Sequence, residues 1–139
     1  MVIMRISSKT MLAVGMTFML VVYQARADVV VIVSADSTTT TAITASQISR
    51  IYLGKSNKLT PFDVADSGAR YQFYTKVVGT DEAKVKARWS RLVFTGKAAA
   101  PKELSSAEVV KAVAADPNAI GYVDRSFVNM TVKVVRTVK

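Results

Sequence analysis

Four adjacent residues, Ser67 to Arg70, combine the groups that could bind a small anion. Ser67 is a favourable N-cap, because its hydroxyl can accept a hydrogen bond from a backbone N–H two or three residues on. The amides of Gly68, Ala69 and Arg70 would then point outward at the positive end of the helix dipole. With the Arg70 guanidinium beside them, they predict a seat for an oxyanion such as phosphate or sulfate. The alternative is that Ser67-Gly68 only starts a helix, since most such pairs bind nothing.

A second group of oxyanion candidates is Ser37, Thr38 and Thr39, in the polar loop 35–41. This loop follows a continuous β-branched run, 28–34, which is typical of a strand buried on both faces in a parallel or mixed sheet. Ligands of layered α/β sheets bind beyond the carboxyl ends of strands, near helix N-termini. The loop and the Ser67 turn both follow predicted strands, so we expect them to face one cleft.

The absence of cysteine and histidine removes the side chains most used for catalysis and for zinc binding. A hydrolase would then need paired carboxylates or a Ser-Lys pair. Asp63 and Asp66 lie near the Ser67 turn, but acids before a helix more often cap it, and their spacing matches no calcium loop. We therefore predict no catalytic residue, no metal site and no cofactor.

Residues 1–27 have the three-part pattern of a secretory signal peptide. Arg5 and Lys9 give the positive start, the run 11–22 is apolar, and Ala25-Arg26-Ala27 supplies small residues for cleavage after Ala27. The apolar run is about half of the roughly 20 residues that span a bilayer. We expect a periplasmic protein with one domain, 28–139, that touches the membrane only through the uncleaved signal peptide.

The predicted mature chain is basic, with 16 Lys and Arg against 10 Asp and Glu, a net charge of +6. Such a surface favours anionic partners, including phosphate-like solutes, acidic polysaccharide and membrane headgroups. Its basic residues are scattered and lack the clustered pattern of a nucleic-acid reader. Export also argues against nucleic acid as a partner.

The predicted elements alternate between strands and helices. Strands are expected at 28–34, 61–64, 119–123 and 131–138, and helices after the caps Thr44, Ser67, Thr80 and Ser105. The apolar faces of these helices include Tyr71, Tyr74, Trp89 and Val93. Ala98 to Pro101 reads as a linker. This order predicts an α/β domain, a sheet covered by helices.

Three separated motifs carry a resemblance to one family. The segment Arg50-Ile51-Tyr52-Leu53-Gly54-Lys55, preceded by Gln47, resembles a segment of the periplasmic phosphate-binding proteins of ABC importers. The motif WSRLVFTGK, 89–97, looks like that of a short subgroup of these substrate-binding proteins. AIGYV, 119–123, with Pro117 before it, is similar to the family's corresponding strand. The motifs occur in the family's order and span most of the predicted mature chain.

The resemblance implies a single lobe of the type 2 periplasmic-binding-protein fold, with a mixed sheet flanked by helices. It also implies a non-enzymatic role: binding inorganic phosphate or a similar oxyanion for an ABC importer. An importer permease or a second copy of the chain would then be a partner. The family's phosphate-binding segment has Arg, Asp and Thr where this chain has Asp63, Ala65 and Ala69. Asp63 would repel phosphate at the place of a bidentate arginine.

Two hypotheses follow. In the first, the chain is an exported solute-binding protein that presents an oxyanion to an importer through Ser67 to Arg70. In the second, it is an interaction module of the cell envelope, derived from a phosphate-binding lobe that no longer captures solute. The replacements Asp63, Ala65 and Ala69 favour the second hypothesis.

Overall fold

The computed structural model describes residues 28–39 and 43–139. The predicted signal peptide and its cleavage site after Ala27 lie outside these ranges. No helix within them is long and apolar enough to span a bilayer.

Five strands form one mixed sheet in the order β3-β2-β4-β1-β5. Their bounds are β1 Val29–Ser34, β2 Thr60–Val64, β3 Lys102–Leu104, β4 Ala119–Asp124 and β5 Val132–Thr137. β2 runs parallel to β3 and β4, whereas β1 is antiparallel to both of its neighbours, β4 and β5. The mixed sheet is therefore confirmed, and β3, which lies between the predicted linker 98–101 and the predicted cap Ser105, was missed.

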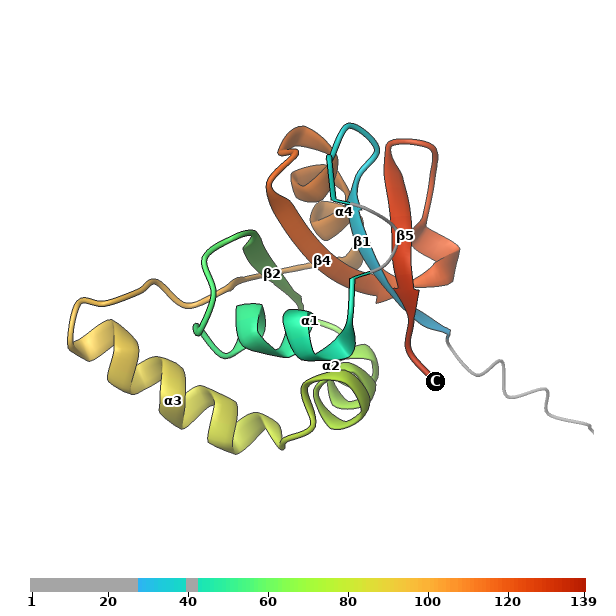
Figure 1. Cartoon of the computed structure of the whole chain (residues 1–139). Helices are drawn as coiled ribbons and strands as arrows, with labels where there is room; N and C mark the ends of the chain where they lie inside the picture. The colour runs from blue at the N-terminus through green and yellow to red at the C-terminus, as the bar shows by residue number, and fades with distance from the viewer. Residues whose placement is uncertain (1–27, 40–42) are drawn as a thin grey trace, which may run out of the picture.

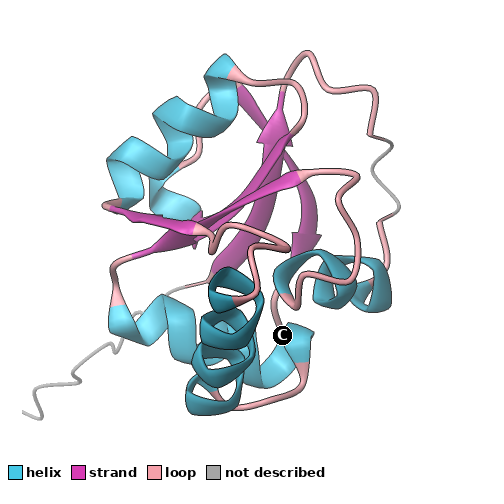
Figure 2. Ribbon diagram, turned by 90° about the vertical axis from the view of Figure 1, so that its left-hand side faces the viewer, coloured by secondary structure: helices cyan, strands magenta, loops and turns pink. Residues whose placement is uncertain are grey.

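Helices cover both faces of the sheet. They are α1 Ala45–Tyr52, α2 Ser67–Phe73, α3 Glu82–Phe94 and α4 Ser106–Ala115, with a π-helical turn η1 Tyr74–Val78 and a 3-10 turn η2 Arg125–Phe127. α4 lies on one face, and α1, α2 and α3 lie on the other (Figures 1 and 2). The predicted α/β class, with a sheet flanked by helices, is confirmed.

Two of the four predicted helix caps are confirmed. Thr44 and Ser105 each accept a hydrogen bond from the third helical amide, and the side chains of Gln47 and Glu108 bond back to them, as a capping box requires. The prediction of Ser67 and Thr80 as caps is wrong, because the aspartate next to each of them is the cap. Asp66 caps α2 and Asp81 caps α3.

The core centres on β1, all six residues of which are buried. On the face covered by α1 and α2, Tyr52, Phe73, Tyr74 and Tyr122 form an aromatic cluster in which Phe73 and Tyr122 stack with ring centroids 3.9 Å apart. The prediction that Tyr71 and Val93 lie in the core is wrong, since Tyr71 is 67% exposed and Val93 is 49% exposed.

Candidate functional site

The Ser67 turn lies at the carboxyl end of β2, as predicted, but its first amide is already bonded. Asp66 Oδ1 accepts a hydrogen bond of 3.0 Å from the Gly68 N–H. Ala69 is buried, only 3% exposed. The prediction required outward-pointing free amides. It is wrong for Gly68, because the chain's own carboxylate occupies that donor, and for Arg70, whose N–H donates to the Asp66 carbonyl at 3.0 Å.

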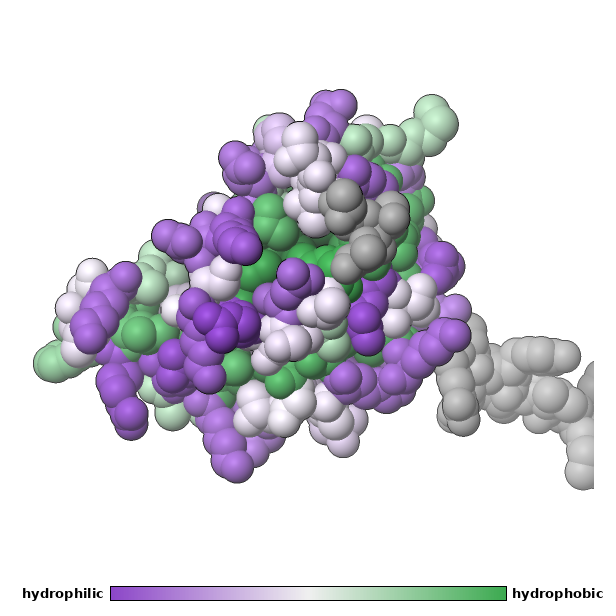
Figure 3. Space-filling model, in the orientation of Figure 1, coloured by the Kyte–Doolittle hydropathy of each residue, from purple (hydrophilic) through white to green (hydrophobic). Residues whose placement is uncertain are grey.

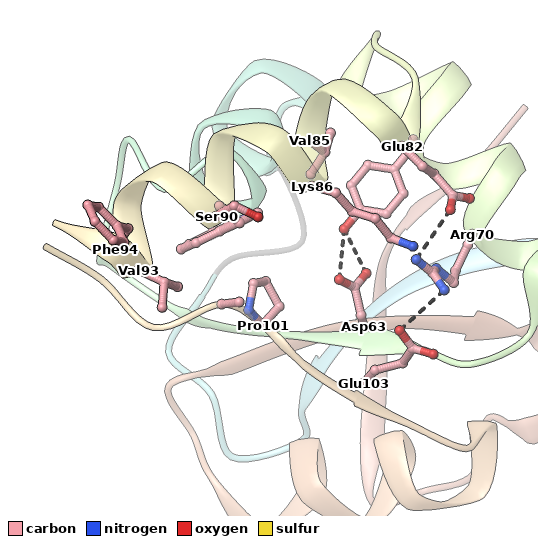
Figure 4. A pocket seen from close by; sticks show the side chains of 13 residues that line it. Asp63, Arg70, Glu82, Val85, Lys86, Ser90, Val93, Phe94, Pro101 and Glu103 are labelled. Atoms are coloured by element: carbon pink, nitrogen blue, oxygen red, sulfur yellow. Dashed lines mark hydrogen bonds and ion pairs between the residues drawn. The ribbon is translucent and has the colours of Figure 1, made fainter. Parts of the chain in front are cut away.

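Arg70 is bound by two carboxylates from distant parts of the chain. Its guanidinium lies 3.2 Å from an oxygen of Glu82 on α3 and 3.2 Å from an oxygen of Glu103 on β3 (Figure 4). These are the two ion pairs that the described residues contain. Arg70 therefore joins α2, α3 and β3, and its charge is offset before any anion arrives.

Asp63 lies beside Arg70 and is the most enclosed acid of this end of the sheet. Its carboxylate accepts hydrogen bonds from the hydroxyls of Tyr122, at 2.6 Å, and Tyr74, at 2.7 and 2.9 Å. Burial raises the pKa of Asp63, against the lowering effect of both hydroxyls and of Arg70. Burial, together with the charge of Asp63, also raises the pKa of the two tyrosines. The tyrosines could not be linked to Asp63 from sequence, because Tyr122 lies far along the chain.

A cavity of about 590 Å³ opens beside this cluster. Its charged end is formed by Asp63, Arg70, Glu82, Lys86 and Glu103 (Figure 4). Its other end is apolar, with side chains of α3 and of the segment leading to β3: Val85, Trp89, Val93, Phe94 and Pro101. With three carboxylates against two cations, its charged end does not favour an anion.

The second predicted group, Ser37 to Thr39, lies at the opposite end of the sheet. β1 runs antiparallel to β4, and β4 runs parallel to β2, so β1 ends where β2 and β4 begin. The expectation of one shared cleft is therefore wrong. Ser37 is buried, and its hydroxyl accepts from the Thr39 N–H at 3.1 Å. Its carbonyl accepts from Lys133 Nζ at 2.7 Å.

Thr38 and Thr39 line a second cavity, of about 700 Å³. The turn between α1 and β2 forms much of its wall and brings Lys55 and Lys58, while Arg50 comes from α1. The sequence did not predict that these three cations cluster. Lys55 and Lys58 belong to the KSNK turn, a pattern that is usually only solvated, and Arg50 lies in the helix before it. Their clustering depends on the loop after β1 and the Pro117 turn coming together around them.

No set of three or more His, Cys, Asp or Glu side chains suited to a metal ion occurs in the described ranges. The sequence contains no histidine or cysteine. Ser90, the serine among the described residues that line the first cavity, is exposed on α3. The site therefore offers hydrogen bonds, charges and apolar contacts for binding.

This fold is shared with substrate-binding proteins of transporters. One solved neighbour is assigned as a phosphate ABC transporter substrate-binding protein with bound phosphate, from Clostridium perfringens, with TM-score 0.60 and 22% identity over 78% of this chain. Another is an ABC-type phosphate transport receptor from Vibrio cholerae, with TM-score 0.57 and 18% identity over 77% of this chain. No family model and no curated relative matches the sequence.

The chain spans less than half the length of these two structures, 44% of each. At these identities the likeness establishes the fold, a lobe like those of phosphate-binding proteins. Both neighbours are described as transport components and not as enzymes. What this lobe binds has to be argued from its own residues.

Proposed function

We propose that this chain is an interaction module of the cell envelope, built on a phosphate-binding-like lobe that does not capture free phosphate at the carboxyl end of β2. The observation that carries the proposal is the pairing of Arg70 with both Glu82 and Glu103 at 3.2 Å. The two carboxylates offset the charge of this guanidinium, which weakens its attraction for phosphate. Asp63, beside it, adds repulsion for an anion.

Two further contacts support the proposal. Asp66 already bonds the Gly68 amide, so the dipole end of α2 is partly satisfied by the chain itself. Large apolar side chains that line the cavity remain exposed, with Phe94 92% and Val93 49% exposed. Exposed apolar side chains near a cavity are a common feature of contact surfaces.

The competing function is oxyanion capture for an ABC importer, with Ser67 to Arg70 as ligands and a permease or a second copy of the chain as partner. The neighbours' descriptions favour it, since both name phosphate transport. A site on one lobe would be open to water, and each of its hydrogen bonds would compete with solvent. The contacts of Arg70 make it the second choice.

Calorimetric titration of the purified protein with inorganic phosphate separates the two functions. We expect no saturable heat at millimolar phosphate while circular dichroism shows an intact fold. Immobilised protein should retain envelope partners whether or not phosphate is present. Saturable one-to-one phosphate binding that is lost in Arg70→Met, with the fold intact, would refute the proposal and establish oxyanion capture.

Export to the periplasm is part of this proposal and rests on the pattern of residues 1–27. The expected product is a mature protein that begins at Asp28. Mass spectrometry of the protein recovered from the periplasm checks this, and an intact N-terminus in the cytoplasmic fraction would contradict it.

A further inference from the structure

The turn 54–59, between α1 and β2, separates two neighbouring cavities. One is the cavity of about 700 Å³ lined by Thr38 and Thr39, and the other, of about 420 Å³, lies toward α3 and the segment 97–99. Lys55, Ser56 and Asn57 line both cavities. The two hollows therefore adjoin across this turn, and we call the two hollows with the turn between them the basic tract.

The cations of the basic tract have no acidic partner among the described residues. Arg50, Lys55 and Lys58 line the larger cavity and Lys97 the smaller, and no described lining residue of either is Asp or Glu. None of the four forms an ion pair with another described residue. Four like charges around two adjoining hollows repel one another and attract anions from solution.

The rest of the tract supplies hydrogen-bonding groups above apolar surface. Amide and hydroxyl side chains include those of Asn57, Asn118 and Thr38, and Leu59 and Pro117 add apolar surface. Figure 3 shows the face that carries this turn, where hydrophilic residues surround a patch of hydrophobic ones. Sugar rings have a matching surface, because their hydroxyl groups form hydrogen bonds and their C–H faces are apolar.

We infer that the basic tract binds a stretch of an anionic polysaccharide, whose carboxylate or other anionic groups meet Arg50, Lys55, Lys58 and Lys97. This inference rests on the proposed function and gives its partner a chemical class. Two adjoining hollows fit consecutive units of one polymer, so binding should strengthen with chain length. A flat anionic membrane would reach the rims of these two hollows but not their floors.

The test uses the whole protein, with hexagalacturonate as the probe and galacturonate monomer as the short form. Calorimetry should show saturable binding of the hexamer, at least about tenfold tighter than the monomer and weakened by added salt. The double variant Lys55→Glu/Lys58→Glu should weaken hexamer binding by about tenfold or more, because it reverses two charges of the tract.

The matched control is Lys76→Glu/Lys111→Glu, which makes the same change in net charge at exposed positions outside the basic tract. It should change hexamer affinity by less than about twofold, since long-range effects of exposed charges are screened. An equal loss in both double variants would overturn the inference, because net charge alone would then explain binding.

Three other results would also overturn it. The hexamer could fail to bind, the monomer could bind as tightly as the hexamer, or vesicles with anionic headgroups could bind with the Lys55/Lys58 dependence while the hexamer does not. None of these results changes the phosphate titration at Arg70, so failure of this inference is distinguishable from failure of the proposed function.

Discussion

The two ends of the sheet differ in whether their charged side chains have partners of opposite charge or hydrogen-bond donors within the described chain. At the carboxyl ends of β2 and β3, Arg70 is bound by Glu82 and Glu103, and Asp63 accepts from two tyrosine hydroxyls. At the other end, Lys55 and Lys58 line a cavity without a described acidic residue. The comparison teaches that a single arginine at a helix start says little about binding until its partners are known.

The largest effect should follow from removing the acid of the paired end. Asp63→Leu leaves the hydroxyls of Tyr74 and Tyr122 without their acceptor, and we expect a loss of about 3 kcal/mol in the free energy of unfolding. Urea denaturation measures it. Tyr122→Phe, which removes one donor and keeps the ring stack with Phe73, should cost only about 1 kcal/mol. Equal costs for the two variants would show that the carboxylate is not the centre of the cluster.

Gly54 lies between the basic tract and α3, because it starts the turn of the basic tract and packs against Trp89 and Leu92 of α3. Its φ is +70°, and an added Cβ would lie 2.8 Å from Leu92 Cδ1 and 3.1 Å from Trp89 Cη2. We expect Gly54→Ala to cost about 2–3 kcal/mol, from backbone strain together with the clash. Gly79→Ala is the control, since Gly79 also has a positive φ but its Cβ would meet nothing within 4 Å. Thermal denaturation should rank Gly54→Ala as clearly more damaging.

Arg70→Met tests the ion pairs of the paired end alone. It should lower the free energy of unfolding by about 1–2 kcal/mol, a limited amount because Glu82 and Glu103 are 32% and 50% exposed and solvent screens them. The same substitution at Arg91, exposed on α3 and without an ion pair to a described residue, should change it by less than about 0.5 kcal/mol. If both variants change the free energy of unfolding by the same amount, the ion pairs of Arg70 do not stabilise the fold.

The raised pKa of Asp63 predicts a pH dependence of stability. The folded chain holds this proton more tightly than the unfolded chain, so its contribution to stability decreases as the pH rises above the ordinary value of 3.8 and levels off above the raised pKa. Asp63→Asn removes the titration and keeps an oxygen that can accept from the tyrosines. The difference in unfolding free energy between wild type and variant should therefore change with pH across the acidic range. A constant difference would contradict the raised pKa.

The smallest effect on stability should come from the basic tract. Lys55→Gln/Lys58→Gln removes two cations that hold no described carboxylate, and we expect a change within about 0.5 kcal/mol. Urea denaturation checks it. A clear loss of stability would mean that these lysines serve the fold, and the contrast between the two ends would disappear.

Sequence predicted the parts of this fold that depend on near neighbours. The buried run of β1, the capping boxes at Thr44 and Ser105, and the α/β class follow from local patterns and are confirmed. The short strand β3 was missed because three residues carry little pattern. Tyr71 was assigned to the core from helical spacing, yet the buried face of this helix runs through Ala69 and Phe73, four residues apart, and leaves Tyr71 exposed.

The candidate site was less predictable, because its contacts join distant segments. Arg70 lies 33 residues before Glu103, and the sequence around either residue does not predict their ion pair. The direction of β1 decides whether Thr38 and Ser67 share a cleft, and a buried apolar strand has the same pattern in either direction. The competition between Ser67 and Asp66 for the cap is local, but both residue types are good caps, so pattern alone could not choose.

The placement of β1 also bears on when the domain can fold. Both neighbours of this interior strand come from the last part of the chain, and the Val138 N–H donates to the Val29 carbonyl. During synthesis β1 therefore has no strand to pair with until most of the chain has been made. Domains with such non-local contacts fold slowly. The complete pairing of β1 therefore requires the last strand of the chain, β5.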